Sequence, residues 1–347
     1  MKKLIAMLLA LLMVFSLVAC GAKEEAPAAQ EETKTEAPKE EAKEEAPAEE
    51  EAPAEEAAPA KDEYFIGVTL QNMSEEFMIM LQAAMESKAA EYGNVKIVIN
   101  DAESDAMKQT SQVESFMAQG ADAIIVCPYD GDACAPAIKA SVDAGIPTIC
   151  LSSNVNGDHG QVWVGSGHYT AGQIEAQYVV DQLGGEGNVA VLRGPLGHFA
   201  EQDRAAGYQD VWDANPGINV VFDQTANWQR DEAMALVENW LSTGTEINAI
   251  CCQNDAMALG AYEAVKAAGK ESEIPVYGID AIKDALDSIS AGGLAGTCFQ
   301  DAIGQGATAV ELAMDAIAGK EISDTDIPFE LVTPENVESY YSRISLS

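Results

Sequence analysis

Histidine and basic side chains are scarce in this chain. Its 347 residues include 3 His and 19 Lys and Arg against 57 Asp and Glu, which gives a formal net charge of −38. A nucleic-acid-binding protein needs positive charge to neutralise phosphates, so this balance argues against that class. The sequence also lacks a G-x-S-x-G motif, a Walker loop and a cluster with metal-ligand spacing. We therefore expect no cofactor, no bound metal and no enzyme of those classes.

Long apolar runs are also missing, apart from one at the start of the chain. Leu4 to Val18 is almost wholly apolar and follows Lys2 and Lys3. This pattern is typical of an export signal, and the small residues before Cys20 match a lipobox. We expect residues 1–20 to be a lipoprotein signal peptide, cleaved before Cys20, whose thiol then carries a diacylglyceryl group. The alternative is a membrane span with an incidental cysteine, for which the run is short.

The segment that follows the signal has almost no side chain that could build a core. Gly21 to Ala60 contains 14 Glu and 4 Lys, with Ala and Pro filling most of the rest. Such a segment cannot offset its ordering entropy, so residues 21–61 are expected to be a disordered tether.

The signal carries +2 and this segment −10, which leaves −30 on residues 61–347. We interpret that acidity as a contribution to solubility. The protein would then stand outside the cytoplasm, anchored by lipid to the outer face of the cell membrane.

The cysteines allow two interpretations. An even number beyond Cys20 in an exported protein is compatible with disulfides. Several of them, however, lie within apolar runs that are typical of buried strands, where a free thiol behaves as a small hydrophobic group. We favour free structural thiols and keep at least one disulfide as the alternative. The six are Cys127, Cys134, Cys150, Cys251, Cys252 and Cys298.

From Lys61 onward, short apolar runs alternate with helical patterns, and the rhythm restarts near the middle. Apolar strands alternating with helices indicate parallel sheets covered on both faces. The predicted fold class is α/β, with two doubly wound, Rossmann-like domains. Predicted strands are Tyr64 to Leu70, Val95 to Asn100, Ala123 to Cys127, Pro147 to Leu151, Asn188 to Leu192, Val220 to Phe222, Ala249 to Cys252, Pro275 to Ile279 and Thr297 to Phe299. Predicted helices are Ser74 to Tyr92, Ala106 to Gln119, Ala133 to Ala144, His168 to Leu183, Ala200 to Ala214, Asp231 to Ser242, Asp255 to Ala268, Ala281 to Ala291 and Gly304 to Ala318.

Hydrogen-bonding and aromatic side chains gather just after these strands. Ligands of open α/β sheets bind beyond the carboxyl ends of the strands. Carboxylates, amides, an imidazole and a guanidinium suit the hydroxyls of a polyhydroxylated ligand, and aromatic faces suit the C–H faces of its ring. The candidate ligand-binding residues are Glu75, Phe77, Ser152, Ser153, His198, Arg204, Trp228, Asn254, Asp280 and Gln300.

Each candidate also has a local explanation. A polar residue before a helix can cap it, a charged one can form a surface ion pair or favour the helix dipole, and an aromatic one can belong to the core. These alternatives are capping for Asn254 and Asp280, an ion pair for Arg204, core for Trp228 and Phe77, an idle loop histidine for His198 and a dipole effect for Glu75. Their common position at one sheet edge favours a site.

Several of these segments together resemble a known family. They are Ile66-Gly67-Val68-Thr69 with Phe77, Gly194 to His198 with Arg204, Thr225 to Trp228, Asn254 to Ala261, Pro275 to Ala281, and Leu294 to Thr297. Residues 64 to 345 are similar to the type I periplasmic sugar-binding proteins, closest to the galactose/glucose- and ribose-binding proteins. The resemblance implies an extracytoplasmic solute-binding protein, expected as a monomer. It would capture a monosaccharide or polyol for the permease subunits of an ABC importer.

The resemblance also implies roles for the candidates. Phe77 and Trp228 would sandwich the sugar ring. Glu75 stands at an acidic ligand-binding position. The hydroxyls would be bound by Asp280, Asn254, Arg204, His198 and Gln300.

The sequence departs from the family's pattern at three places. Ser152 and Ser153 stand where relatives have Asn or Asp-Arg, and Ala200 stands where the galactose/glucose proteins have a second acid. The Ser152-Ser153 position and the Ala200 position determine ligand specificity in the family. Asp181 to Gly187 is shorter than the calcium loop of those proteins and lacks its ligands, so no calcium is expected.

The resemblance further implies a chain path. One lobe would comprise residues 62–165 plus 302–329, and the other 166–301 plus 330–347. Three crossovers, near Ser166-Gly167, Gln300-Asp301 and Pro328 to Val332, would form a hinge between them.

Two alternatives to the importer remain at this point. One is a binding protein that serves a chemoreceptor or signalling system. The other is an enzyme in which Glu75 and Asp280 act as a glycosidase pair, which a chromogenic glycoside would reveal. A transcription regulator of this fold would need a helix-turn-helix head, and the acidic tether occupies that place.

Overall fold

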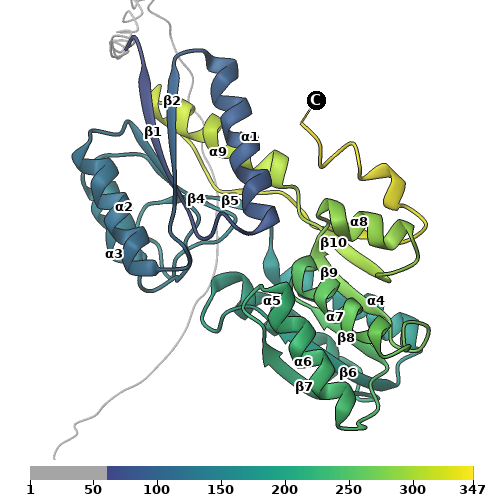
Figure 1. Ribbon diagram of the computed structural model, residues 1–347. Helices are drawn as coiled ribbons and strands as arrows, with labels where there is room; N and C mark the ends of the chain where they lie inside the picture. The colour runs from purple at the N-terminus through teal and green to yellow at the C-terminus, as the bar shows by residue number, and fades with distance from the viewer. Residues whose placement is uncertain (1–60, 347) are drawn as a thin grey trace, which may run out of the picture. The chain divides into compact units, whose positions relative to one another are not determined.

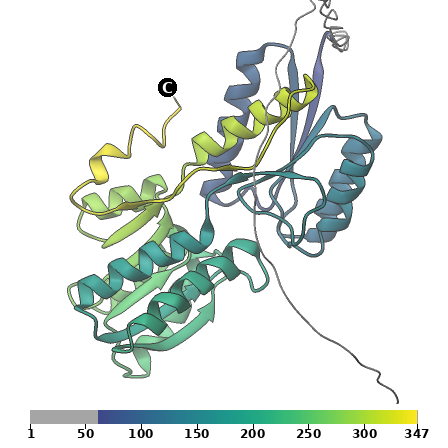
Figure 2. The same cartoon turned by 180° about the vertical axis from the view of Figure 1, so that it is seen from behind.

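The computed structural model describes residues 61–346 (Figures 1 and 2). The described residues belong to one compact unit. The expected signal peptide, Cys20 and nearly all of the expected tether lie outside the described residues. Within the described part, no helix has the length and apolarity needed to cross a membrane.

The first sheet is built from the N-terminal strands. Its order is β11-β5-β4-β3-β1-β2, and the pairs are parallel. Its central strands are apolar and fully buried because helices cover both faces. The strands are β1 Tyr64–Leu70, β2 Val95–Asp101, β3 Ala123–Val126, β4 Thr148–Leu151, β5 Val162–Gly165 and β11 Thr325–Asp326. The associated helices are α1 Glu76–Tyr92, α2 Ala106–Ala118, α3 Ala135–Asp143 and α9 Ala302–Ile317.

The second sheet repeats this architecture. Its order is β12-β10-β9-β8-β6-β7, parallel except for the antiparallel edge pair of β10 and β12. The strands are β6 Gly187–Arg193, β7 Ile218–Thr225, β8 Ala249–Cys252, β9 Val276–Asp280, β10 Gly296–Phe299 and β12 Glu330–Val332. The helices are α4 His168–Leu183, α5 Phe199–Ala214, α6 Arg230–Ser242, α7 Asp255–Ala267 and α8 Lys283–Ser290, with a short 3-10 turn η1 Val337–Ser339. Two parallel-sheet α/β domains confirm the predicted fold class.

The chain passes three times between the two sheets. The first crossover lies between β5 and α4, the second between β10 and α9, and the third between β11 and β12. After the second, α9 returns to lie beside α1 in both views (Figures 1 and 2). Each sheet with its helices is called a lobe below.

Three strands have no counterpart among the predicted ranges, namely β5, β11 and β12, a three-residue strand at the edge of the second sheet. β5 is four residues long, and β11 has two, both polar. β11 is too short to carry a period-two or apolar pattern, and the apolar run of β5 is only three residues before a glycine, below the four to eight that indicate a buried strand. Both pair at the edge of the first sheet next to the crossovers, where tertiary pairing determines their conformation.

The six cysteines beyond Cys20 are all buried and free in the structure. Burial raises the pKa of the Cys127 thiol to about 12, which makes it a poor nucleophile. The preferred interpretation of structural thiols is confirmed.

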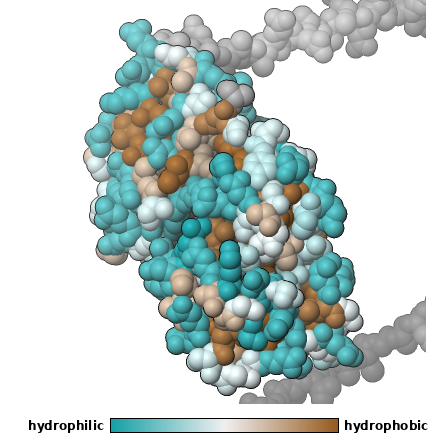
Figure 3. All heavy atoms as spheres, turned by 45° about the vertical axis from the view of Figure 1, so that its right-hand side comes forward, coloured by the Kyte–Doolittle hydropathy of each residue, from teal (hydrophilic) through white to brown (hydrophobic). Residues whose placement is uncertain are grey.

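The face shown in Figure 3 is largely hydrophilic, in keeping with the acidic composition of the chain.

A buried carboxyl group in the second lobe gives a pH-dependent stability. Glu175 on α4 accepts hydrogen bonds from the Tyr208 hydroxyl and, at 3.1 Å, from the Cys252 amide. Desolvation raises its pKa from 4.5 to about 8. The proton is therefore held more tightly in the folded state. The stabilising contribution of this group is full below about pH 4.5 and is lost as pH rises through about 8.

We expect Glu175→Gln to remove this dependence. The amide keeps the shape of the neutral acid and cannot ionise. Chemical unfolding measured between about pH 4.5 and pH 9 should show the free energy of unfolding of the wild type falling toward alkaline pH. The free energy of unfolding of the variant should fall less and should be higher than that of the wild type at high pH. Parallel pH profiles for the two proteins would contradict the assignment.

Candidate functional site

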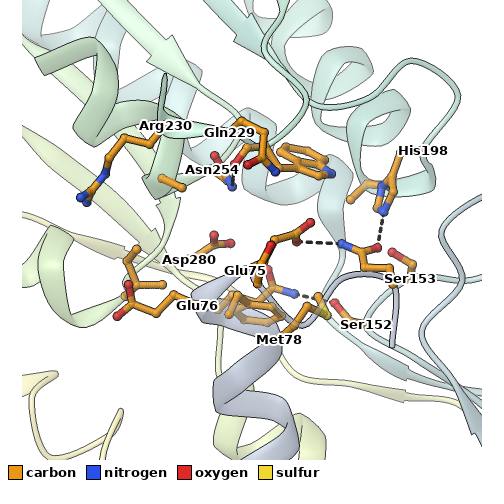
Figure 4. A pocket seen from close by; sticks show the side chains of 18 of the residues that line it. Glu75, Glu76, Met78, Ser152, Ser153, His198, Gln229, Arg230, Asn254 and Asp280 are labelled. Atoms are coloured by element: carbon orange, nitrogen blue, oxygen red, sulfur yellow. Dashed lines mark hydrogen bonds between the residues drawn. The ribbon is translucent and has the colours of Figure 1, made fainter. Parts of the chain in front are cut away.

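A cavity of about 230 Å³ lies between the strand ends of the two sheets. This is smaller than the roughly 300–1,000 Å³ of pockets for drug-sized ligands, so it suits a single small ring. Its walls come from the loops after β1 and β4 on one side and after β6, β7, β8 and β9 on the other. Figure 4 shows Glu75, Asn254, Asp280 and His198 gathered around it, whereas the Arg230 side chain points away.

All ten candidate residues from the sequence line this cavity. They are Glu75, Phe77, Ser152, Ser153, His198, Arg204, Trp228, Asn254, Asp280 and Gln300. Ala200, which the sequence analysis gave as a specificity position, also lines the cavity. The further lining residues, which were not among the candidates, are Gln71, Ser74, Glu76, Met78, His168, Gln229, Arg230, Ala256, Ile282 and Asp284. For Gln71 a signal existed, because it directly follows β1. The place of His168 depends on packing between distant segments.

A relay of hydrogen bonds crosses the cavity between the two lobes. His198 Nδ1 accepts from the Ala200 amide at 3.1 Å, so Nε2 carries the proton and donates to Gln71 Oε1 at 2.7 Å. Gln71 Nε2 then donates to Glu75 Oε2 at 3.0 Å. The dashed lines in Figure 4 join Glu75 and His198 through this one amide. Burial, with a smaller effect of the Arg204 charge, lowers the pKa of His198 to about 3, so the imidazole is neutral.

Glu75 stands at the N-cap position of α1 but does not cap it. Its carboxylate faces the cavity instead. Desolvation raises its pKa to about 7, against the lowering effect of the Gln71 hydrogen bond, and nearby Asp101 adds to the rise. The group is thus poised between a hydrogen-bond donor and an acceptor near neutral pH.

Arg204 and Asp280 form the charged centre of the site. The two side chains are 4% and 8% exposed, and Arg204 Nη2 lies 3.8 Å from Asp280 Oδ1. Arg204 also donates to the Gln253 carbonyl and, at 2.9 Å, to Gln300 Oε1. Burial raises the pKa of Asp280, and the Arg204 charge opposes that rise. Arg204 does not form a surface ion pair, which was its alternative role, because it is buried. Asp280 does not cap the following helix, because the N-cap of α8 is Ile282.

Trp228 lies in a strained turn between β7 and α6. Its φ is 63°, in the left-handed region that non-glycine residues rarely occupy. The indole is 5% exposed and packs on the core of the second lobe while also lining the cavity. Gly194 makes room for it, since a Cβ there would meet the indole Cζ2 at 2.1 Å. Phe77 has the same double role in the first lobe.

The remaining candidates are fixed by their own contacts. Asn254 caps α7 by accepting from the Met257 amide at 2.9 Å, and it also lines the cavity. Ser152 Oγ accepts from Gln300 Nε2 at 3.1 Å, which joins the two lobes at the wall of the cavity. Two buried donors, Arg204 Nε and Trp228 Nε1, have no acceptor among the described residues. The site therefore combines aromatic surfaces with both donors and acceptors.

Comparisons with known proteins agree with this geometry. The model of the family described as "Periplasmic binding protein domain" matches residues 66–321. The chain belongs to this family. Its members bind solutes, and the described residues include no group of three or more His, Cys, Asp or Glu arranged to hold a metal ion.

Three similar proteins are named for a solute or were solved with one. A Rhizobium meliloti protein named "Putative rhizopine-binding protein" is 38% identical over 80% of this chain and 93% of its own length. A xylitol-binding protein of Mycolicibacterium smegmatis is 35% identical over 79% of this chain and 78% of its own. An ABC transporter solute-binding protein of Bacillus halodurans, solved with myo-inositol, is 41% identical with a TM-score of 0.80 over 82% of this chain and 100% of its own. This periplasmic binding protein is thus similar to proteins that are named for a polyhydroxylated solute or were solved with one.

Proposed function

We propose that this periplasmic binding protein captures a cyclic polyol or monosaccharide in the cavity between its lobes and delivers it to the permease of an ABC importer. The observation that carries the proposal is one small cavity lined by two aromatic side chains and by polar groups from both sheets. Neighbours that bind myo-inositol and xylitol support a polyhydroxylated ligand.

The proposed roles follow from the chemistry of each group. Phe77 and Trp228 offer apolar faces to the ligand ring. Arg204 donates to hydroxyl oxygens, and its buried Nε gains an acceptor there. Carboxylates and side-chain amides accept and donate in turn. The further polar contacts would come from Glu75, Ser152, Ser153, His198, Asn254, Asp280 and Gln300.

A thermal-shift panel tests the proposal. The probes are myo-inositol, D-ribose, D-allose, xylitol and glycerol at matched concentrations. A ligand at 100 times its Kd stabilises by about 2.7 kcal/mol, and we expect a cyclic probe to give the largest shift. Absence of any shift across the panel would overturn the proposed ligand class. Turnover of a chromogenic glycoside would overturn the assignment as a binding protein rather than an enzyme.

We further propose that Cys20 anchors the protein to the membrane. The support is the lipobox sequence before Cys20. Mass spectrometry of the mature protein should show a lipidated N-terminal cysteine, and Cys20→Ala should leave an unlipidated precursor. An unmodified Cys20 in the mature wild type would contradict the anchor.

The raised pKa of Glu75 predicts pH-dependent binding. An ionised carboxylate accepts stronger hydrogen bonds from hydroxyls than a neutral acid does. Because burial places the pKa at about 7, we expect affinity for the best probe of the panel to rise as pH increases through neutrality. Calorimetry on Glu75→Gln should give a flatter profile. An equal slope in both proteins would assign the dependence to another group.

A further inference from the structure

His168 is the first residue of α4 and directly follows the first crossover. It is 2% exposed, and its ring lies between two phenylalanines, with centroid distances of 6.1 Å to Phe199 and 5.8 Å to Phe329. Phe329 belongs to the third crossover, between β11 and β12. This histidine therefore contacts two of the three chain passages between the lobes.

Both ring nitrogens of His168 have partners, and the partners fix its tautomer. Nδ1 lies 3.3 Å from Arg204 Nη2, and a guanidinium can only donate. Nδ1 therefore accepts, and Nε2 carries the proton and donates to the Ser152 carbonyl at 3.1 Å. Burial, followed by the Arg204 charge, lowers the pKa of His168 well below its usual value, which keeps Nδ1 available as an acceptor.

These contacts close a ring of four residues. His168 donates to Ser152, and Arg204 donates to His168 and to Gln300 Oε1. Gln300 Nε2 completes the ring by donating to Ser152 Oγ at 3.1 Å. Ser152 follows β4 of the first lobe, Arg204 lies on α5 of the second, and Gln300 begins the second crossover. The ring thus spans the hinge twice.

Close helix packing holds two of these residues together. A Cβ at Gly172 on α4 would meet the Arg204 carbonyl oxygen at 2.2 Å. The backbones of α4 and α5 can approach this closely only because residue 172 is a glycine. His168 and Arg204 are therefore fixed on a rigid pair of helices, whereas Ser152 belongs to the other lobe.

We propose that His168 is a positioning residue for ligand capture, which links the pocket arginine Arg204 to the three crossovers and so couples ligand contact to the hinge angle. This inference rests on the proposed function, in which a ligand is captured in the cavity between the two lobes. Closing or opening changes the relation between Ser152 and the helix pair, and the ring transmits that change to the guanidinium that faces the ligand.

The ring is not needed to satisfy buried groups. Ser152 O also accepts from Trp163 Nε1 at 3.2 Å, and Arg204 Nη2 retains Gln300. Replacing His168 with Phe keeps an aromatic ring between its neighbours and leaves neither partner without a hydrogen bond. The variant is therefore expected to fold with nearly unchanged stability, which separates positioning from a structural role.

Hydrogen exchange measured by mass spectrometry on the ligand-free full chain in detergent tests the inference. In His168→Phe, the cavity-facing segments 71–77 and 198–204 should exchange about tenfold faster because the lobes open more readily. Strand β8 and the melting temperature should not change. His168→Gln, which keeps a donor near the Nε2 position, should give a smaller effect. His159→Phe, in a loop outside the cavity, is the matched control and should match the wild type.

Two results would overturn the inference. One is wild-type exchange in both cavity-facing segments of His168→Phe. The other is faster exchange throughout the chain together with a lower melting temperature, which would show a purely structural role. Since no ligand is used, either result is independent of whether the panel identifies a polyol.

Discussion

Trp228→Ala should reduce affinity for the ligand at least about 30-fold, which corresponds to about 2 kcal/mol for a central aromatic anchor. The physical reason is that the indole forms a wall of the cavity and is itself fixed by core packing and by the space at Gly194. Phe77→Ala should have an effect of the same kind from the opposite lobe. Calorimetry with the best probe of the panel gives the measurement.

Trp240→Ala is the matched control for this prediction. Trp240 belongs to the same core cluster and stacks on Phe222 at 5.1 Å between ring centroids, but it does not line the cavity. Both tryptophan variants should lose stability, and only Trp228→Ala should lose affinity out of proportion. Unchanged affinity in Trp228→Ala and Phe77→Ala would remove the aromatic pair from the site.

Arg204→Met should abolish measurable binding and also destabilise the protein. Removing one partner of a buried ion pair leaves the other charge uncompensated, at a cost of about 3–5 kcal/mol. Here the remaining group is Asp280, whose pKa is already raised by burial. Denaturant unfolding and calorimetry should therefore both change strongly.

A double variant separates the two effects. Arg204→Met with Asp280→Asn removes the uncompensated charge, so it should recover much of the lost stability without recovering binding. Arg230→Met is the control for charge, because Arg230 lies at the cavity's edge, is 42% exposed and pairs with Asp284 at 3.3 Å. It should alter stability little. Binding by the double variant close to the wild-type level would exclude Arg204 from the site.

The sequence predicted the main strands and helices because apolar strands and amphipathic helices have distinct periods. It also predicted which residues gather at the cavity, since parallel strands place their carboxyl ends at one edge. That rule located residues as distant as Glu75 and Asp280 in a single site. Strand β5 and the edge strands β11 and β12 could not be predicted, because their few residues owe their conformation to pairing near the crossovers.

Several candidate residues have both the local structural role that was the alternative and a place in the cavity wall. Asn254 caps its helix and lines the cavity, and Trp228 and Phe77 are core and cavity wall at once. Sequence reasoning treats these roles as exclusive, but a cavity at the edge of a core uses one side chain for both. His168 could not be assigned a role at all, because its partners lie in segments separated by up to 161 positions in the chain.

Small-angle scattering of the described part of the chain, residues 61–346, with and without the best probe of the panel, tests the central claim most directly. That claim is that one ligand contacts both lobes and stabilises their closed arrangement, since a ligand shifts a conformational equilibrium only through such differential contact. The account predicts a smaller radius of gyration at saturation, and no change in Trp228→Ala at the same probe concentration. An unchanged wild-type profile, with binding confirmed by calorimetry, would contradict it.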